Sequence, residues 1–232
     1  RKGFSENFMS KSDYSEENWF GKNLLPWLGK KGITKIDYLV LTHLHSDHCG
    51  GLITLLNQKK IKHIFVSDES TKQELWNYAS KQKYFGTAQI HTVTDTCSFF
   101  TGKAKLKFLH PDKSYHPLNE NNSSLVCRLD TKKERLLFTG DIEAEAENYL
   151  VDNYAQELKA DFLKIPHHGS RNSSSSEFLQ AVNPQEVWIT ASSRNIYHFP
   201  HPETIKRLQK QQTKILITGN GTIRKMIDSR SN

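Results

Sequence analysis

The stretch that decides the fold reads His43-Leu44-His45-Ser46-Asp47-His48, in which four of six residues carry a side chain that can bind a metal ion. It follows an apolar run at 36–42 that predicts a buried strand, and it precedes Gly50-Gly51 and a predicted helix over 50–56. On a loop that leaves a strand, His43 and His45 can point to one side while Asp47 and His48 turn toward a second position. This order of elements indicates two adjacent metal sites in an α/β fold.

The ligand types indicate which metals would bind. Imidazole and carboxylate groups at this density match Zn²⁺ or Mn²⁺ better than Mg²⁺ or Ca²⁺. The alternative is a chance cluster of surface histidines. Gly50-Gly51 argues against that alternative, because the glycines let a helix start close behind the ligands.

A second stretch, Leu136-Leu137-Phe138-Thr139-Gly140-Asp141, reads as an apolar strand that ends in glycine and aspartate. Taken alone, Asp141 would be interpreted as the cap of a following helix. Beside the histidine-rich stretch, its carboxylate can instead bridge two metal ions that lie roughly 3.5 to 4 Å apart. We therefore expect Asp141 to be a metal ligand.

Two later stretches add histidines. Lys164-Ile165-Pro166-His167-His168-Gly169-Ser170 follows another predicted strand, and its paired histidines can bind metal, act as acid and base, or contact a phosphate. For His167 a purely structural role is an equal alternative. Tyr197-His198-Phe199-Pro200-His201-Pro202-Glu203 is a proline-flanked loop, and we expect at least one of its two histidines to be a ligand.

Composition sets broad limits. The length of 232 residues fits one large domain over 1–232, and no apolar run approaches the roughly 20 residues that a membrane-spanning helix needs. The formal net charge of +7 favours an anionic partner, although a solvated lysine-rich surface is the equally good alternative. The three cysteines are odd in number and scattered, which excludes a fully paired disulfide framework; we expect Cys97 and Cys127 to be buried.

The chain alternates between predicted strands and helices. Strands are expected at 36–42, 63–67, 105–109, 125–129, 135–138, 162–165, 186–190, 214–218 and 222–227. Helices are expected at 50–56, 70–83, 141–158, 176–182 and 202–211. Sheets covered on their outer faces by helices would form a layered α/β/β/α sandwich.

These stretches, in this order, resemble the metallo-β-lactamase superfamily, in which a histidine-rich loop, a strand-end aspartate and a late histidine make a dinuclear metal site. The resemblance is closer still to the C-terminal hydrolase domain of the ComEC family of bacterial DNA-uptake proteins. It covers essentially the whole chain and rests on five segments: 42–51, Asn121-Asn122-Ser123-Ser124-Leu125-Val126, Thr139-Gly140-Asp141-Ile142-Glu143, 166–170 and 197–203.

The sequence departs from the family pattern in two ways. Members usually open with Asp-Val-Gly-Gln-Gly-Asp and a strand that ends in Asp-Thr-Gly, so we expect this chain to lack the first strands and to leave a sheet edge unpaired. The third motif is normally a histidine, whereas here Asn121 to Ser124 stand in its place, and His116 is a candidate substitute. Cys49 lies where relatives have an apolar residue, which favours packing over a thiolate ligand.

The resemblance implies a set of ligands and roles. His43 and His45 would hold one of two divalent ions, Zn²⁺ or Mn²⁺; the second ion would be held by Asp47, His48 and His201, and Asp141 would bridge the two. Asp47 and His168 are the catalytic candidates in a phosphodiester hydrolysis, with His168 contacting the phosphate or protonating the leaving oxygen and Ser170 nearby. The implied substrate is DNA, chiefly single-stranded. The domain would be joined to a membrane channel portion of the same protein, on the extracytoplasmic side of the bacterial cell membrane.

Two other functions stay open. One is a free-standing hydrolase of a small ester, lactone, thioester or phosphorylated metabolite, because the same metal site serves these reactions. The other is a catalytically weak DNA-binding or structural domain of the uptake machinery, which the missing third histidine makes plausible. A cleft dominated by basic residues would favour nucleic acid, and a closed apolar pocket would favour a small ester.

Overall fold

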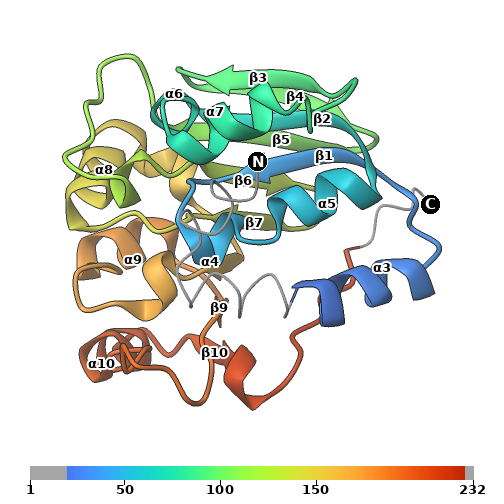
Figure 1. Cartoon of the computed structure of the whole chain (residues 1–232). Coiled ribbons are helices and arrows are strands. Elements are labelled where there is room, and N and C mark those ends of the chain that lie inside the picture. Colours follow the sequence, from blue (N-terminus) through green and yellow to red (C-terminus); the bar gives the residue numbers. More distant parts are fainter. Residues whose placement is uncertain (1–19, 228–232) are drawn as a thin grey trace. The chain divides into compact units, whose positions relative to one another are not determined.

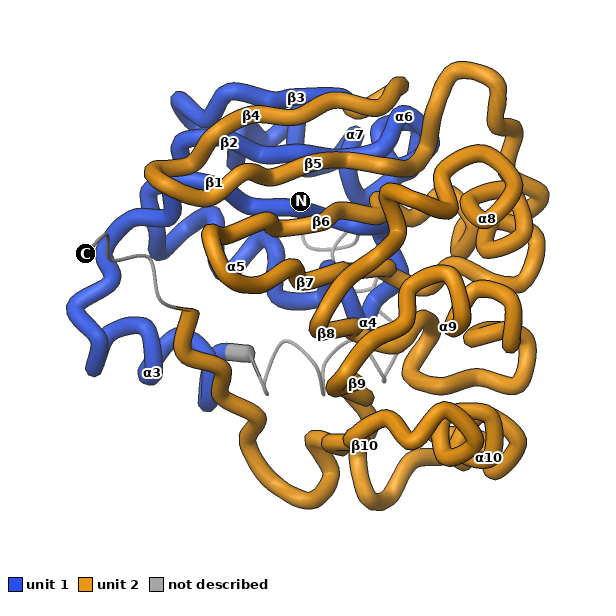
Figure 2. The backbone as a smooth tube through the Cα atoms, turned by 180° about the vertical axis from the view of Figure 1, so that it is seen from behind, with its two compact units in different colours: residues 1–92 blue, residues 93–232 orange. Residues whose placement is uncertain are grey.

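The computed structural model describes residues 20–227. The chain divides into two compact units, 1–92 and 93–232, which Figure 2 draws in different colours. Each unit contains its own sheet and its own apolar core. That the two units make one domain stays a prediction.

The first unit has a three-stranded sheet in the order β1-β2-β3 (Figure 1). Its strands are β1 (Lys35–Leu41), β2 (Lys60–Ser67) and β3 (Gln89–Val93), and β1 and β2 run parallel. Its helical elements are η1 (Phe20–Leu24), α3 (Leu25–Lys30), α4 (Ser46–Cys49), α5 (Leu52–Gln58), α6 (Asp68–Thr71) and α7 (Glu74–Lys81). The buried side chains of α3, α5 and α7 form one core with β1 and β2, so these helices pack against the sheet.

The second unit has a seven-stranded sheet in the order β10-β9-β8-β7-β6-β5-β4. Strands β4 (Cys97–Thr101), β5 (Ala104–His110), β6 (Val126–Asp130) and β7 (Arg135–Phe138) form an antiparallel meander. Strands β8 (Phe162–Lys164), β9 (Glu186–Ile189) and β10 (Lys214–Ile217) continue from β7 in parallel. The carboxyl ends of β7, β8 and β9 therefore meet at one edge of this sheet.

Three helices cover one face of the larger sheet. They are α8 (Ala144–Leu158), α9 (Ser176–Val182) and α10 (Pro202–Lys210), and their apolar side chains share a core with β6 to β9 (Figure 1). Single-turn 3₁₀ helices lie at η2 (Asn121–Ser123), η3 (Pro166–Gly169) and η4 (Thr218–Asn220). Leu150, Phe178 and Leu163 are fully buried in this core, which fixes the loops that follow β7 and β8.

The structure confirms most of the predicted elements and corrects several. The predicted strand at 222–227 is wrong, because those residues are irregular. The predicted helix at 70–83 is two short helices, α6 and α7, and α4 forms inside a stretch predicted as loop. Cys127 is buried as predicted, whereas Cys97 is exposed because it lies on β4, the last strand in the order of the larger sheet. Cys49 is buried, and its thiol donates to the carbonyl oxygen of Leu44 at 3.0 Å, which fits a packing role.

Candidate metal centre

In the first unit, the histidine-rich stretch gathers three imidazole rings at the end of β1. His43 is fully buried, and its Nε2 lies 3.1 Å from Nδ1 of His45. The ring of His48 lies 4.2 Å from that of His43 between centroids. Two nitrogens bound to one metal at about 2.0 to 2.1 Å in tetrahedral geometry are a little over 3 Å apart, so the His43–His45 spacing fits such a site.

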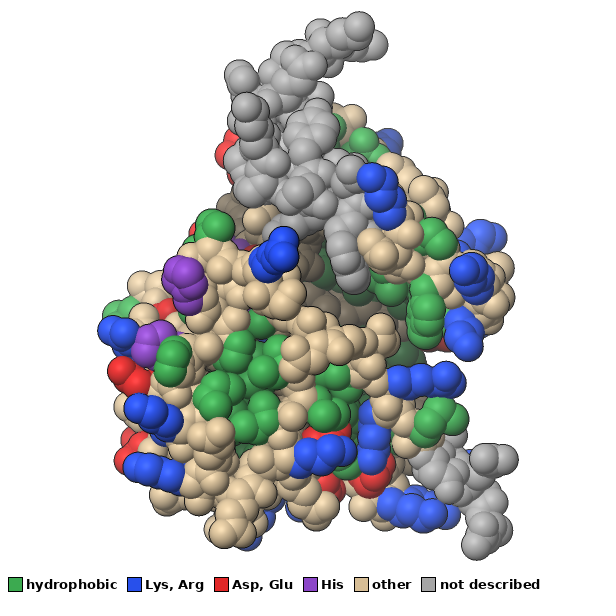
Figure 3. Space-filling view, turned by 90° about the horizontal axis from the view of Figure 1, so that it is seen from below, with side chains coloured by type: hydrophobic (Ala, Val, Ile, Leu, Met, Phe, Trp, Pro, Cys, Tyr) green, Lys and Arg blue, Asp and Glu red, His purple; other side chains and the backbone are tan. Residues whose placement is uncertain are grey.

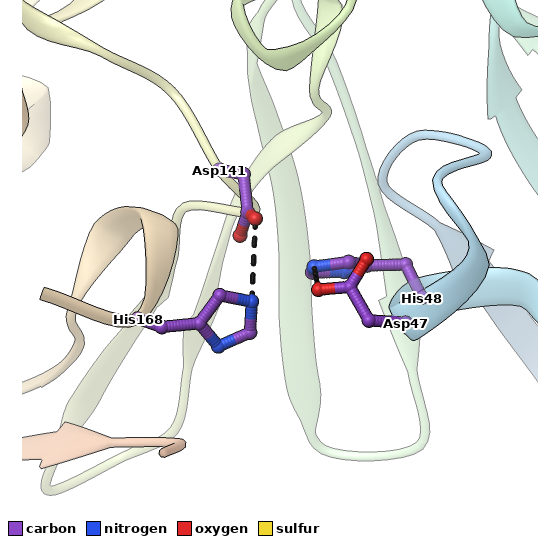
Figure 4. Close-up of side chains that lie close together, drawn as sticks. All are labelled: Asp47, His48, Asp141 and His168. Carbon is purple, nitrogen blue, oxygen red and sulfur yellow. Dashed lines mark ion pairs between the residues drawn. The ribbon is translucent and has the colours of Figure 1, made fainter. Parts of the chain in front are cut away.

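Asp47 and His48 of this stretch lie on α4. Asp47 Oδ2 is 3.5 Å from His48 Nε2 (Figure 4). Thr42, the residue after β1, places its hydroxyl oxygen 3.2 Å from His43 Nδ1 and 3.4 Å from His48 Nδ1. A short helix directly after a strand therefore brings the carboxylate and the imidazoles of adjacent residues into one cluster.

In the second unit, Asp141 and His168 form a pair although they are far apart in the sequence. Asp141 follows β7 and His168 follows β8, and these strands are parallel neighbours. Figure 4 shows the Asp141 carboxylate pointing at the imidazole, with Oδ2 3.3 Å from Nε2 of His168. Asp141 is almost fully buried, at 2% exposure. The parallel topology thus brings a carboxylate and an imidazole together at the carboxyl edge of the sheet.

The hydrogen bonding of His168 tests whether this pair fits a cation. Its Nδ1 lies 2.6 Å from the carbonyl oxygen of Thr190, and because a carbonyl only accepts, Nδ1 must carry the proton. In the neutral ring Nε2 then presents a lone pair toward the Asp141 carboxylate, which also only accepts. Two such groups face each other favourably when a proton or a metal ion lies between them, so the donor set fits a divalent metal.

The backbone around Asp141 is held by side chains from other elements. Its N–H donates to Oγ of Ser124 at 3.1 Å, in the segment that replaces the third histidine motif. Lys164, the last residue of β8, donates to the carbonyl oxygen of Gly140 at 3.1 Å and lies 3.5 Å from Asp141 Oδ1. Sequence reasoning did not identify Lys164, although a lysine in an otherwise apolar strand was a usable signal.

His167 points to a different partner. Its Nδ1 lies 3.2 Å from Oε1 of Glu143, a carboxylate that also accepts from the side-chain amides of Asn119 and Asn121. Burial lowers the pKa of His167, and the nearby carboxylates of Asp141 and Glu143 oppose that shift. Both His167 and His168 have left-handed backbone conformations, with φ of 46° and 54°. Such strain in adjacent non-glycine residues is typical of functional sites.

His201 serves as the N-cap of α10. Its Nδ1 lies 3.3 Å from the N–H of Glu203, and its Nε2 lies 2.8 Å from an Arg171 guanidinium nitrogen. A neutral imidazole has one acceptor nitrogen, so only one of these contacts is a full hydrogen bond. Both ring nitrogens of His201 therefore lie beside these two residues, and its role as a metal ligand stays a prediction.

Two residue pairs are therefore the candidates for holding metal: Asp47 with His48 in the first unit and Asp141 with His168 in the second. His43 and His45 lie within the same cluster as the first pair. The side chain of His116, the candidate substitute for the histidine of the third motif, is exposed. Sequence reasoning missed Thr190, which contributes a main-chain oxygen and so gives no signal in the sequence.

Two cavities occur within single units. One of about 370 Å³ lies beside Asp47 and His48 in the first unit and is lined by Leu39, Leu41, Leu52 and Leu55. The other, of about 560 Å³, is lined by Lys132, Lys133, Arg135 and Lys159 in the second unit. It lies where β7, β8 and β9 begin, at the opposite edge of the sheet from Asp141, so its basic character does not bear on the candidate ligands.

A family profile matches most of the chain. Residues 13–189 match the metallo-beta-lactamase superfamily. The chain belongs to this superfamily. Its fold is the metallo-β-lactamase fold, as the sequence predicts, and the superfamily relationship makes it a metal-dependent hydrolase by family.

Two curated relatives are competence proteins. The chain is 35% identical over 225 residues to ComE operon protein 3 of Bacillus subtilis, a match that covers 90% of this chain and 28% of the relative. It is 29% identical over 195 residues to competence protein ComA of Neisseria gonorrhoeae, covering 84% and 26%. The predicted likeness to competence proteins is confirmed, and the chain spans about a quarter of the length of these relatives.

A solved structure shares the fold at low sequence identity. CmlA of Streptomyces venezuelae, a diiron β-hydroxylase, superposes with a TM-score of 0.51 at 14% identity, over 78% of this chain and 43% of CmlA. At this identity the likeness concerns the fold alone. Within residues 20–227, no helix has the length and apolar character that crossing a membrane requires.

Proposed function

We propose that this chain is a metal-dependent phosphodiesterase that cleaves DNA with the help of two divalent ions. The proposed ligands are His43, His45, Asp47, His48 and Asp141. The observation that carries the proposal is the Asp141–His168 pair, in which a buried carboxylate suited to hold an ion lies 3.3 Å from the imidazole proposed to act on the substrate. His201 is retained in the proposed ligand set on the strength of its motif alone.

The bound ions would supply two kinds of chemistry. They would lower the pKa of bound water toward about 7, and they would neutralise charge on a phosphodiester oxygen. The donor set of imidazoles and carboxylates suits Zn²⁺ or Mn²⁺.

The side chains of this protein would then orient the substrate and move protons. The Thr190 carbonyl fixes the tautomer of His168, so Nε2 is the atom that exchanges a proton or contacts a phosphate oxygen. Lys164 places its ammonium nitrogen 3.5 Å from Asp141 Oδ1, where it can orient that carboxylate. Ser170 is buried, and its carbonyl oxygen accepts from the hydroxyl of Thr204.

The biological setting rests on the relatives. One of them is named competence protein ComA and another ComE operon protein 3, and we propose that the chain acts on single-stranded DNA during uptake, as part of a longer protein that carries a membrane channel. The net charge of +7 supports an anionic substrate. The proposed position is the extracytoplasmic side of the bacterial membrane.

One observation favours a second candidate. The cavity of about 370 Å³ beside Asp47 is lined largely by leucines, and an apolar pocket of this kind suits a small ester or lactone better than a nucleic acid. Hydrolysis of such esters, without cleavage of DNA, would establish this alternative.

The test compares metal-loaded and chelated protein on three substrates: single-stranded DNA, double-stranded DNA and a small ester. We expect cleavage of DNA that requires Mn²⁺ or Zn²⁺ and that returns when metal is restored after chelation. Asp141→Asn should remove the activity, while Asp152→Asn, a change at an exposed carboxylate on α8, should leave it intact. Equal DNA cleavage by the parent and Asp141→Asn would refute the proposal.

A further inference from the structure

A ladder of aromatic rings leads from the surface of the second unit to His168. Tyr197 and Phe199 are stacked with centroids 5.6 Å apart and planes inclined by 20°. Phe199 and His168 are stacked at 6.3 Å and 15°. Tyr197 is 68% exposed, and its neighbour Ile196 is 83% exposed. The outer end of this ladder therefore presents an apolar ring to solvent, and the inner end is the ring that pairs with Asp141.

The loop that carries the ladder is held in one conformation by its own side chains. The side chain of Asn195 accepts from the backbone N–H of Phe199 at 2.8 Å and donates to the carbonyl oxygen of the same residue at 2.7 Å. It also donates to the carbonyl oxygen of Ser192 at 2.9 Å. Both backbone groups of Phe199 are thus bound by one amide, so the exposure of Tyr197 belongs to an ordered loop.

The same loop is fastened to the segment that carries His168. The N–H of His201 donates to the carbonyl oxygen of Gly169 at 2.8 Å. Gly169 lies so close to Pro200 that a Cβ added there would come within 2.7 Å of the Pro200 Cβ. These contacts hold the loop that carries Tyr197 and Phe199 against the segment that carries His168.

The segment that carries the ladder is rich in basic residues. Arg171 has a side chain that is 64% exposed and lies beside His201. Between 191 and 211 a single acidic residue, Glu203, accompanies four basic ones: Arg194, Lys206, Arg207 and Lys210. Figure 3 looks onto the side of the molecule where α10 and β10 lie, and hydrophobic side chains gather there with basic, acidic and histidine side chains around them.

An exposed ring surrounded by cations is how proteins bind unpaired bases, because every base has a face that stacks on an aromatic ring while the backbone needs positive charge. Bases in a duplex already stack on each other and do not offer that face. We propose that Tyr197 is the stacking platform for a base of single-stranded DNA, which sets the preference for single strands and positions the strand toward His168. This proposal rests on the proposed function and deepens it.

The experiment measures binding of a fluorescein-labelled thymidine 12-mer by anisotropy, with metal-free protein so that cleavage plays no part. Because stacking of one base contributes about 1 to 3 kcal/mol, Tyr197→Ala should weaken binding by about tenfold or more. Tyr197→Phe should bind like the parent, since it keeps the ring. Phe100→Ala is the matched control: Phe100 is 73% exposed on β4 and is not part of the ladder, so binding should not change.

A second oligonucleotide separates stacking from charge. A 12-mer of the same charge whose central positions lack bases should bind the parent as weakly as the normal strand binds Tyr197→Ala, and the variant should lose nothing further on it. The salt dependence should be equal for parent and variant, because no phosphate contact is removed.

Three outcomes would contradict the role of Tyr197 as a stacking platform. They are an unchanged affinity of Tyr197→Ala for the normal strand, an equal loss of affinity caused by Tyr197→Ala on the normal and the abasic strand, and a change in the oligomeric state of the variant without a change in DNA binding. The proposed function is judged separately, by metal-dependent cleavage and its loss in Asp141→Asn. DNA cleavage by a protein whose Tyr197 does not affect binding would remove the platform and leave the phosphodiesterase in place. Binding of DNA through Tyr197 without cleavage would support the stacking platform and contradict the proposed phosphodiesterase.

Discussion

The two groups of candidate ligands are built in opposite ways. In the first unit, His43, His45 and Asp47 come from alternate residues of one short stretch after a strand, and their positions depend on the local course of the chain. In the second unit, Asp141 and His168 are brought together by two parallel strands, and side chains from several elements hold the backbone around them. Asp47 has 42% of its side chain exposed, whereas Asp141 has 3%.

This difference indicates which ligands, when replaced, affect the stability of the protein as well as its chemistry. Within the local group, Asp47 can change without disturbing a core, because 42% of its side chain is exposed. A group assembled from distant segments is part of the packing, so a change in it affects both the chemistry and the fold. The predictions below test this contrast, starting with the largest effect.

Asp47→Ala and Asp141→Ala should each reduce metal-dependent hydrolysis by about a thousandfold, because each removes a proposed ligand. Only Asp141→Ala should also lower the free energy of unfolding, by about 3 kcal/mol, because it leaves the Lys164 ammonium without its buried carboxylate. Urea unfolding of the metal-free proteins measures the second quantity. Equal stability losses in the two variants would contradict the contrast.

Gly169→Ala tests how tightly the His168 segment is packed. Gly169 has φ of +82°, and a Cβ there would clash with Pro200, so we expect a loss of about 4 kcal/mol in the free energy of unfolding. Gly102→Ala is the control, with φ of +62° and open space around it, and it should cost only about 1 kcal/mol. Thermal or urea unfolding gives both values, and similar losses would show that the contact with Pro200 yields easily.

Because His110 is buried, we expect acid to lower the stability of the second unit. Its Nε2 donates to the carbonyl oxygen of Asn122 at 2.8 Å, and burial lowers its pKa to about 4. In the unfolded chain the pKa is near 6.5, so below that value the unfolded state takes up a proton that the folded state refuses. Stability is therefore complete above pH 6.5 and falls by up to about 3 kcal/mol as the pH drops to 4.

The variant His110→Gln should flatten this pH dependence, because glutamine can keep the bond to Asn122 and does not titrate. His116→Gln, at an exposed histidine, should leave the dependence as it is. Urea midpoints measured from pH 7.5 to pH 4 give the slopes. An unchanged slope in His110→Gln would assign the acid sensitivity to other groups.

Ser124→Ala is the mildest test of the support around Asp141. Ser124 is fully buried, and its loss leaves the Asp141 N–H without its acceptor, which should cost about 2 kcal/mol in stability and weaken metal binding several-fold. Ser123→Ala removes a hydroxyl that donates to the carbonyl oxygen of Glu120 instead, so it should lower stability without affecting the metal. Titration with Mn²⁺ or Zn²⁺ by calorimetry separates the two variants.

The same contrast explains what the sequence could predict. The ligands of the first unit lie within six residues, so their pattern was visible without any structure. Asp141 and His168 were also found, because each ends a recognisable strand. Their supports were not: Lys164 acts through strand pairing, Ser124 acts across 17 residues, and Thr190 acts through its main chain. The wrong strand at 222–227 had β-branched residues but no neighbour to pair with.

The bond between His168 and the carbonyl of residue 190 has a consequence for divergence among related chains. A main-chain oxygen is supplied by every amino acid, so replacing the threonine leaves the protonation of the ring unaltered. Insertion or deletion of one residue in β9 would instead displace that oxygen and release the ring. Homologous sequences can therefore drift freely in side-chain identity at this point, while the length of the strand is under constraint.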